Sequence, residues 1–157
     1  MIVPIEIGSI LLDAASGAPH ILIREAHGRR SLTIPISSYE ANTIFMNSLE
    51  SGPANPLIID FITDLISRLG GAIERIVVGR HSSQGLRARV HISRNGDQTV
   101  CDCRVCDALA LALRSRASLF AEDAVFATPD DPRQRKQLLQ RSIANTDTVE
   151  FGLYYLE

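Results

Sequence analysis

Four acidic residues occupy positions where a carboxylate could do chemistry. They lie at predicted helix starts or beside predicted strands, not on polar helix faces, and they are Asp60, Asp102, Asp107 and Glu40. Two or three carboxylates converging in a cleft could hold Mg²⁺ or Mn²⁺, which would neutralise a phosphate and lower the pKa of an attacking water. Arg104 would then offer a forked donor to the phosphate. We predict Asp60, Asp102, Arg104 and Asp107 as catalytic residues, with Asp102 and Asp107 as metal ligands.

The same acids also have a structural explanation. Glu40 and Asp107 fall in the first turn of predicted helices, where a carboxylate satisfies free backbone amides and meets the positive end of the helix dipole. Asp102 could cap the same helix as Asp107. No acid is spaced in a diagnostic metal motif. Helix capping and catalysis therefore remain alternatives for these residues.

Three cysteines, Cys101, Cys103 and Cys106, lie within six residues. With His81 or His91 they could form a Cys₃His zinc site. The chain has no second ligand pair at a recognised spacing, which favours buried cysteines that act as small hydrophobes. A secreted disulfide framework would not use such an odd and crowded set, so we predict reduced thiols and a cytoplasmic protein.

A basic strand is the best candidate for binding a polyanion. Between Arg75 and Gly96 the chain has five arginines, two histidines and no acid. Arg87, Arg89 and His91 alternate with apolar residues, so they share one face of a strand and are predicted to bind substrate. The alternative is a solvated sheet face whose arginines pair with carboxylates elsewhere. No aromatic residue lies in this stretch, which argues against sequence-specific reading.

Composition limits the class of protein. The chain has 157 residues, of which 45% are hydrophobic, and a formal net charge of −2. These values fit one compact domain and exclude a uniformly basic surface, so any nucleic acid must meet a local patch. No apolar run reaches the roughly 18 residues of a membrane span, and the start lacks the basic region of a signal peptide.

The elements that must position these residues can be read from periodicity and turn signals. Ser37 and Glu40 have the spacing of a capping box, and Asn55-Pro56 predicts the start of a second, well-buried helix. Asn95-Gly96 predicts a tight hairpin. A third helix, from about 104 to 114, is apolar on nearly all sides and should lie in the interior. Predicted strands cover residues 2–12, 20–25, 31–36, 72–79, 86–93 and 98–103.

Two related halves are indicated, because each has a hairpin, a strand and then a helix with an acid followed by Ala in its first turn. We predict an α+β fold in which a mixed or antiparallel sheet packs on a buried central helix. One domain would cover residues 1–128. Residues 129–157 would form a C-terminal helix and strand packed on that domain.

A segment in the second half of the chain resembles the signature of a known family. The segment Cys101-Asp102-Cys103-Arg104-Val105-Cys106-Asp107-Ala108-Leu109-Ala110-Leu111-Ala112-Leu113-Arg114 resembles the signature of the bifunctional nuclease domain family. Ile34-Pro35-Ile36 followed by Glu40-Ala41 resembles the first-half strand-to-helix segment of the same family. The resemblance implies a small α+β homodimer that cuts DNA and RNA. We therefore expect a metal-assisted, sequence-nonspecific nuclease.

The chain also departs from that family. Where the family has Arg-Pro followed shortly by Thr-His-Asp, this sequence has Asn55-Pro56-Leu57-Ile58-Ile59-Asp60. The Arg and the His are absent, and a histidine would be a natural proton shuttle. A non-catalytic dimeric module that binds a nucleic acid, a small anion or a protein partner is therefore the alternative function. A structural partner subunit would instead present an extensive apolar interface and no cleft.

Overall fold

The computed structural model describes residues 1–13, 15–49, 56–81 and 85–127, and they form one seven-stranded sheet with helices. The strands are β1 (Ile2–Leu12), β2 (Pro19–Glu25), β3 (Ser31–Pro35), β4 (Gly71–His81), β5 (Gly85–Arg94), β6 (Asp97–Cys103) and β7 (Ser118–Glu122). The helices are α1 (Ser38–Ser48), α2 (Ile58–Arg68), α3 (Val105–Ser115) and the short 3₁₀ helix η1 (Asp123–Ala127). The predicted α+β class is confirmed.

The sheet is mixed, with the strand order β3-β2-β1-β7-β4-β5-β6. Only β4 and β7 pair in parallel; the other neighbours are antiparallel. Asn95 and Gly96 both have positive φ, at 51° and 90°, which is the conformation of the predicted tight hairpin between β5 and β6. This turn fixes the register of β5 against β6, and therefore which side chains face outward.

The predicted two-half organisation is visible in the topology. β1, β2 and β3 form an antiparallel group followed by α1, and β4, β5 and β6 form another followed by α3. β7 lies between the two groups and pairs with β1 on one side and β4 on the other. The acid and the alanine that the halves share also coincide: Glu40 and Asp107 are each the third residue of their helix, and Ala41 and Ala108 are fully buried.

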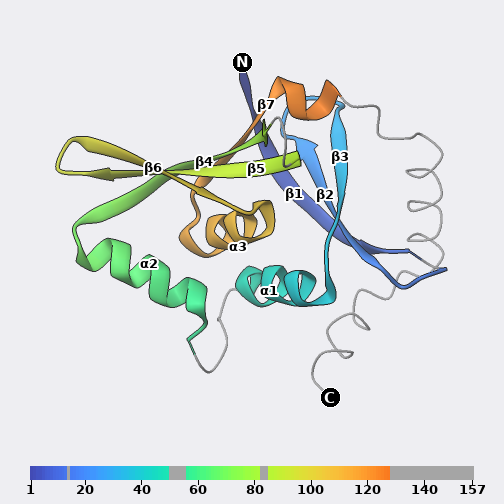
Figure 1. The fold of residues 1–157 in the computed structure, drawn as a ribbon, viewed down its shortest axis with the longest axis horizontal. Helices are drawn as coiled ribbons and strands as arrows, with labels where there is room; N and C mark the ends of the chain where they lie inside the picture. The colour runs from blue at the N-terminus through green and yellow to red at the C-terminus, as the bar shows by residue number, and fades with distance from the viewer. Residues whose placement is uncertain (14, 50–55, 82–84, 128–157) are drawn as a thin grey trace.

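Helix α3 packs against both the sheet and the other two long helices. It contacts α1, α2, β4 and β5, and seven of its 11 residues are buried. In Figure 1 α1, α2 and α3 lie on one side of the sheet, with α3 directly beneath β4 and β5. Leu109 is fully buried, and Ala108, Ala110 and Ala112 allow close packing against the strands. The start of α3 is thereby held in a fixed place relative to α1 and β5.

Helix α2 differs from its prediction in two respects. It begins at Ile58 with Leu57 in the capping position, so Pro56 is not the first helical residue; Asn55 lies outside the described residues. Asp60 accepts a hydrogen bond from the Leu57 amide, at 2.7 Å, and so closes the first turn. The helix is also not well buried: Ile59 is its one buried residue, while Ile58, Phe61, Leu65 and Leu69 are exposed.

The end of the described chain is anchored to its beginning. The Asp123 amide donates to the Met1 carbonyl at 3.1 Å, and Arg30 joins the β2–β3 turn to η1 by contacting Glu25 and Asp123. The predicted helix and strand of residues 129–157 lie outside the described residues. Within the described ranges, no helix has the length and apolar character needed to cross a bilayer.

Candidate nucleic-acid site

The first turns of α1 and α3 meet at one end of the helical layer. Ser37 caps α1: its hydroxyl accepts from the Glu40 amide at 3.2 Å, and the Glu40 carboxylate accepts from the Ser37 amide at 2.8 Å. This is the predicted capping box. The other oxygen of Glu40 lies 3.8 Å from a guanidinium nitrogen of Arg104, which occupies the capping position of α3. The N-termini of α1 and α3 therefore lie beside each other.

Arg104 is oriented by two carboxylates. Its Nε and one terminal nitrogen donate to the two oxygens of Asp107, at 2.8 and 3.0 Å, and another terminal nitrogen faces Glu40. The side chain of Arg104 is 59% exposed and that of Asp107 is 41% exposed. With this exposure the guanidinium of Arg104 is open to solvent, so a phosphate oxygen can approach it.

A cleft of about 380 Å³ opens beside these helix starts. The strands β3 and β5 supply the rest of its wall, so the cleft brings together residues from both halves of the molecule. Arg87, one of the predicted substrate-binding residues, lines it with Arg104. The full lining is Ile34, Glu40, Leu86, Arg87, Arg104, Val105 and Cys106.

Glu40 is the acid of this cleft, and its charge is held in place. The hydrogen bond from the Ser37 amide, aided by the Ser37 hydroxyl, the Cys106 thiol and the charge of Arg104, holds the pKa of Glu40 below its ordinary value. These contacts outweigh partial burial, which acts in the opposite direction. Glu40 is therefore ionised at neutral pH, and its helix-capping role is confirmed.

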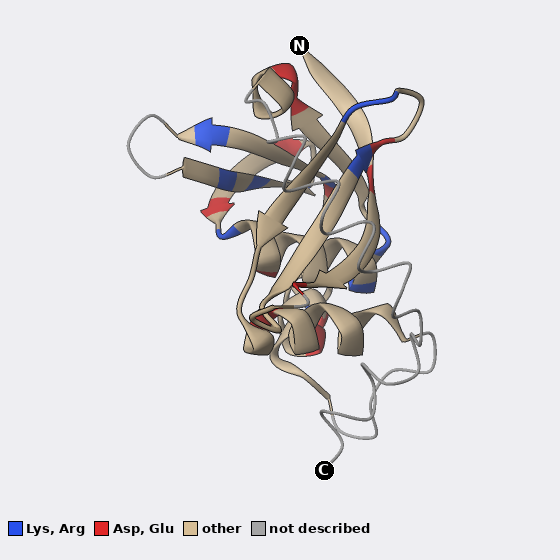
Figure 2. Ribbon diagram, turned by 90° about the vertical axis from the view of Figure 1, so that its right-hand side faces the viewer, with Lys and Arg blue, Asp and Glu red and all other residues tan. Residues whose placement is uncertain are grey.

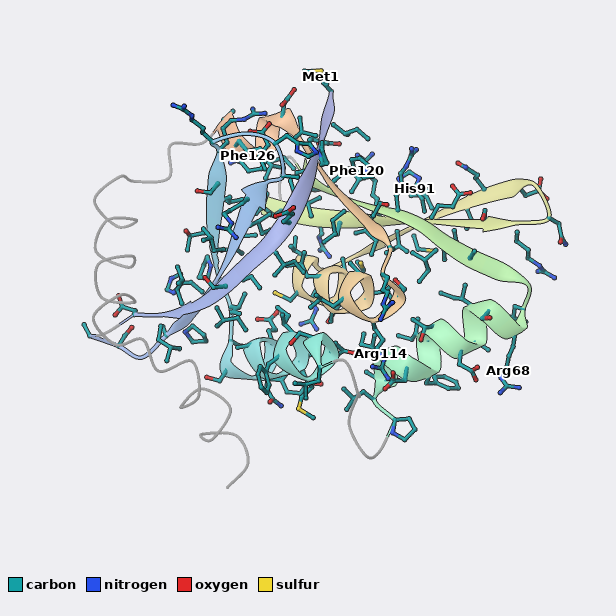
Figure 3. The ribbon with its side chains drawn as sticks, turned by 180° about the vertical axis from the view of Figure 1, so that it is seen from behind. Met1, Arg68, His91, Arg114, Phe120 and Phe126 are labelled. Atoms are coloured by element: carbon teal, nitrogen blue, oxygen red, sulfur yellow. The ribbon has the colours of Figure 1, made fainter. Side chains whose placement is uncertain are left out.

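Asp60 lies away from this cleft. It forms an ion pair with Arg114, which is in the last turn of α3, whereas Arg104 and Asp107 are at the first turn. Figure 3 shows Arg114 where the end of α3 lies beside the start of α2. Both side chains are largely enclosed, with 16% of Asp60 and 28% of Arg114 exposed. The expectation that Asp60, Asp102 and Asp107 converge is therefore wrong, because Asp60 joins α2 to the opposite end of α3.

The two predicted metal ligands are also not arranged as a metal site. Asp102 is exposed on the edge strand β6, opposite Arg89 in register, and both oxygens of Asp107 already accept from Arg104. In the part of the chain that the structure describes, no three His, Cys, Asp or Glu side chains form a group that could hold a metal ion. The residues present do not fit a divalent metal in this arrangement, and a site at Asp102 and Asp107 stays a prediction.

The basic strand face is present, but it is partly neutralised. Ala88 and Val90 are buried on the helix side of β5. Because side chains alternate along a strand, Arg89 and His91 point to the other side. The blue bands in Figure 2 mark arginines of β4 and β5. His91 is seen on the side of the sheet away from the helices in Figure 3. Arg89 forms an ion pair with Glu122 of β7. For Arg89 the structure therefore shows the alternative that the sequence left open, an arginine paired with a carboxylate from elsewhere in the chain.

His91 is not a strong cation on this face. Partial burial lowers its pKa, and the nearby positive charges of Arg75 and Arg89 lower it further. The imidazole is therefore neutral at pH 7 and acts there as a hydrogen-bonding group. The positive charge of this sheet face therefore comes from its arginines.

The three thiols have different surroundings. Cys106 is buried and packs in the core beneath the cleft, as predicted for a small hydrophobe, but Cys101 is exposed. Burial, and then the neighbouring charge of Glu40, raise the pKa of Cys106 to about 12. Burial also raises the pKa of Cys103 to about 11, with Asp107 acting in the same direction. Neither thiol is a nucleophile at neutral pH.

Sequence reasoning missed three features of these surfaces. Glu40 was recognised as a helix cap, but its approach to Arg104 depends on two helices 64 positions apart meeting in space. Nothing in the sequence marked Leu86 or Ile34 as residues of a binding cleft, because half-buried apolar residues are expected in any strand. Glu122 faces Arg89 only because β7 enters the middle of the sheet.

Comparison with known proteins places most of the chain in one family. The family model described as bifunctional nuclease domain matches residues 21–132, a range that contains every residue lining the cleft. Two uncharacterized proteins of Mycobacterium tuberculosis are similar to the chain: MT1877 of strain CDC 1551 / Oshkosh and Rv1829 of strain ATCC 25618 / H37Rv. Each is 30% identical over 123 residues, which cover 78% of this chain and 73% of the relative.

Proposed function

Because the chain belongs to the bifunctional nuclease domain family, we propose that it is a sequence-nonspecific nuclease that hydrolyses phosphodiester bonds of DNA, RNA or both. The observation that carries this proposal is the cleft at the first turns of α1 and α3, where Arg104 and Arg87 lie together. Arginine donates in a planar fork that matches the oxygens of a phosphate. The cleft offers this donor set beside two helix N-termini, which also favour anions.

Arg104 is the residue to which we assign the phosphate. Asp107 and Glu40 act as positioning residues, because they hold the guanidinium at the mouth of the cleft until the phosphate replaces Asp107. Arg87 adds a second positive charge to the cleft. We assign the flanking nucleotides to the outer face of β5, where Arg89 is shared with Glu122 and His91 is a neutral hydrogen-bonding group. The charges within the cleft nearly balance, so binding depends on this exchange of partners and not on a strongly basic surface.

The proposed function does not assign a divalent metal to the cleft, and the cleavage assay tests whether one is needed. Mg²⁺ or Mn²⁺ bound by Asp102 and Asp107 would activate water, but both carboxylate oxygens of Asp107 already accept hydrogen bonds from Arg104. We also propose a homodimer and a cytoplasmic location, on the family membership and on the free cysteines respectively. Sedimentation of the purified protein tests the dimer.

Cleavage assays on the purified chain test the proposed function. Single-stranded DNA, duplex DNA and RNA would each be incubated with Mg²⁺, with Mn²⁺ or with chelator. We expect cleavage by the wild type and about a 10- to 100-fold loss in Arg104→Ala, because a charge-assisted hydrogen bond to phosphate contributes about 1.5–3 kcal/mol. Arg68→Ala, which removes an exposed arginine of α2, is the matched control and should cleave normally.

Two outcomes of this assay would count against the assignment. Cleavage that persists unchanged in Arg104→Ala would remove the cleft as the site. Cleavage that needs a metal and disappears in Asp102→Asn, which leaves the pair of Arg104 and Asp107 intact, would instead restore the metal site predicted from the sequence.

A non-catalytic binding module is the second candidate function. It is favoured by α2, where Ile58-Ile59-Asp60 stands in place of the family's Thr-His-Asp. Ile59 is 5% exposed and packs in the core, and Asp60 is taken up by Arg114, so neither offers a proton shuttle. Binding of nucleic acid without cleavage under any metal condition would support this function and overturn the nuclease.

A further inference from the structure

The cleft beside α1 and α3 is lined by two kinds of side chain. Ile34, Leu86 and Val105 are apolar and are together called the apolar wall, while Arg87, Arg104 and Glu40 are charged. Ile34 and Leu86 are only half-buried: each packs on the core with part of its surface and contributes the remainder to the cleft. The volume, about 380 Å³, is at the small end of the range for ligand pockets.

We propose that this cleft accepts one unpaired nucleotide, with its base against Ile34 and Leu86 and its phosphate on Arg104. A nucleotide likewise combines a flat ring with apolar faces and a charged phosphate group. The inference rests on the proposed function and deepens it by naming the substrate class: a single-stranded nucleic acid, or an unpaired stretch within a longer one.

Base pairing excludes a duplex from this mode of binding. In a duplex the bases are stacked and paired inside the helix, so only the sugar-phosphate backbone can reach Arg104. Moving a base out of the stack of a duplex costs a few kcal/mol, and a base that is already unpaired in a single strand avoids this cost. The apolar wall therefore favours single strands, and it does so without reading sequence, because every base has an apolar face.

The apolar wall also separates this mode from simple phosphate binding. If Arg104 and Arg87 alone held the ligand, affinity would depend on the number of phosphates and on salt, and not on bases. With Ile34 and Leu86 in contact with a base, removing the base or shortening the side chain must weaken binding even though every phosphate remains. This difference can be measured directly.

Three probes of equal length distinguish these modes. Fluorescently labelled oligothymidylate, a duplex and an abasic oligomer with the same number of phosphates would be titrated with the full chain in chelator, and binding followed by anisotropy. We expect oligothymidylate to bind at least about tenfold more tightly than the abasic oligomer or the duplex. Equal affinity for oligothymidylate and the abasic oligomer would overturn the inference.

Variants locate the effect in the cleft. Leu86→Ala and Ile34→Ala should each weaken oligothymidylate binding about fivefold to tenfold and leave the abasic oligomer unchanged. Leu65→Ala, on the exposed face of α2, is the matched control and should change neither affinity. Thermal unfolding of each variant identifies any that lose the fold. If Leu86→Ala and Ile34→Ala, when folded, bind oligothymidylate like the wild type, the base is not in this cleft.

The outcomes separate the inference from the proposed function. Tight, Leu86-dependent binding of oligothymidylate without cleavage would retain the inference and reject the nuclease. Cleavage of duplex and single strands at equal rates, with no effect of Leu86→Ala, would retain the nuclease and reject the inference. Failure of every probe to bind would reject both.

Discussion

Cys101, Cys103 and Cys106 show how one short sequence places three identical side chains in different environments. The strand β6 carries the first two, and the buried first turn of α3 carries the third. Their spacing alone is compatible with a metal site or with core packing. Their burial, which depends on how β6 and α3 pack, assigns Cys106 to the core and leaves Cys101 at the surface.

Thiol alkylation at pH 8 should therefore modify Cys101 first. Only the thiolate reacts, and a pKa of about 12 leaves roughly one Cys106 side chain in ten thousand ionised at that pH. We expect Cys103 and Cys106 to react at least about tenfold more slowly than Cys101, as followed by mass spectrometry of peptides. In denaturant the three thiols should react at similar rates. Labelling of Cys106 as fast as Cys101 in the folded chain would contradict the packing of α3.

At the scale of elements, helix α2 shows the limit of periodicity. Its apolar residues correctly predict a helix, but periodicity cannot say whether another element covers the face, and Ile58, Phe61, Leu65 and Leu69 are exposed. By contrast, the capping box at α1 and the Asn95-Gly96 turn are local, and both are confirmed. Local signals predict where elements begin and turn, whereas coverage depends on long-range packing.

The ion pair between Asp60 and Arg114 should stabilise the packing of α2 on α3. Asp60→Asn retains an oxygen for the Leu57 amide but removes the charge opposite Arg114, so we expect the free energy of unfolding to fall by about 1–3 kcal/mol. Denaturant unfolding measures this change. Nucleic-acid binding and cleavage should be unchanged, because Asp60 is at the far end of α3 from the cleft.

The control for Asp60→Asn is Asp64→Asn on the same helix. Asp64 pairs with Arg68, but the two side chains are 57% and 76% exposed, so its loss should change the free energy of unfolding by no more than about 0.5 kcal/mol. A variant Asp60→Asn that folds with normal stability yet loses cleavage would instead support the catalytic role predicted from the sequence.

At the scale of the whole molecule, the order of strands could not be read from the chain. The two halves were predictable because each repeats a hairpin, a strand and a capped helix. β7 was not predicted as a strand, although it lies at the centre of the sheet and joins the halves. Its five residues have no alternating pattern and no hairpin turn, and its place is determined by packing with β1 and β4. The sequence therefore could not predict that Glu122 is the partner of Arg89.

Glu40 links the two halves and should make global stability depend on pH. Its pKa is lowered in the folded chain from the value of 4.5 that it has when unfolded, so the ionised form stabilises the fold. That contribution is complete above pH 4.5 and is lost as the pH falls through the folded pKa.

Glu40→Gln keeps a capping side chain without the charge, and we expect it to lower the free energy of unfolding by about 0.5–1 kcal/mol at neutral pH. In urea unfolding from pH 7 down to about pH 3, the difference from wild type should shrink below pH 4.5, because protonated Glu40 then resembles Gln. Glu6→Gln, an exposed position on β1, serves as the control. A difference that stays constant over this range would mean that the charge of Glu40 does not hold α1 against Arg104.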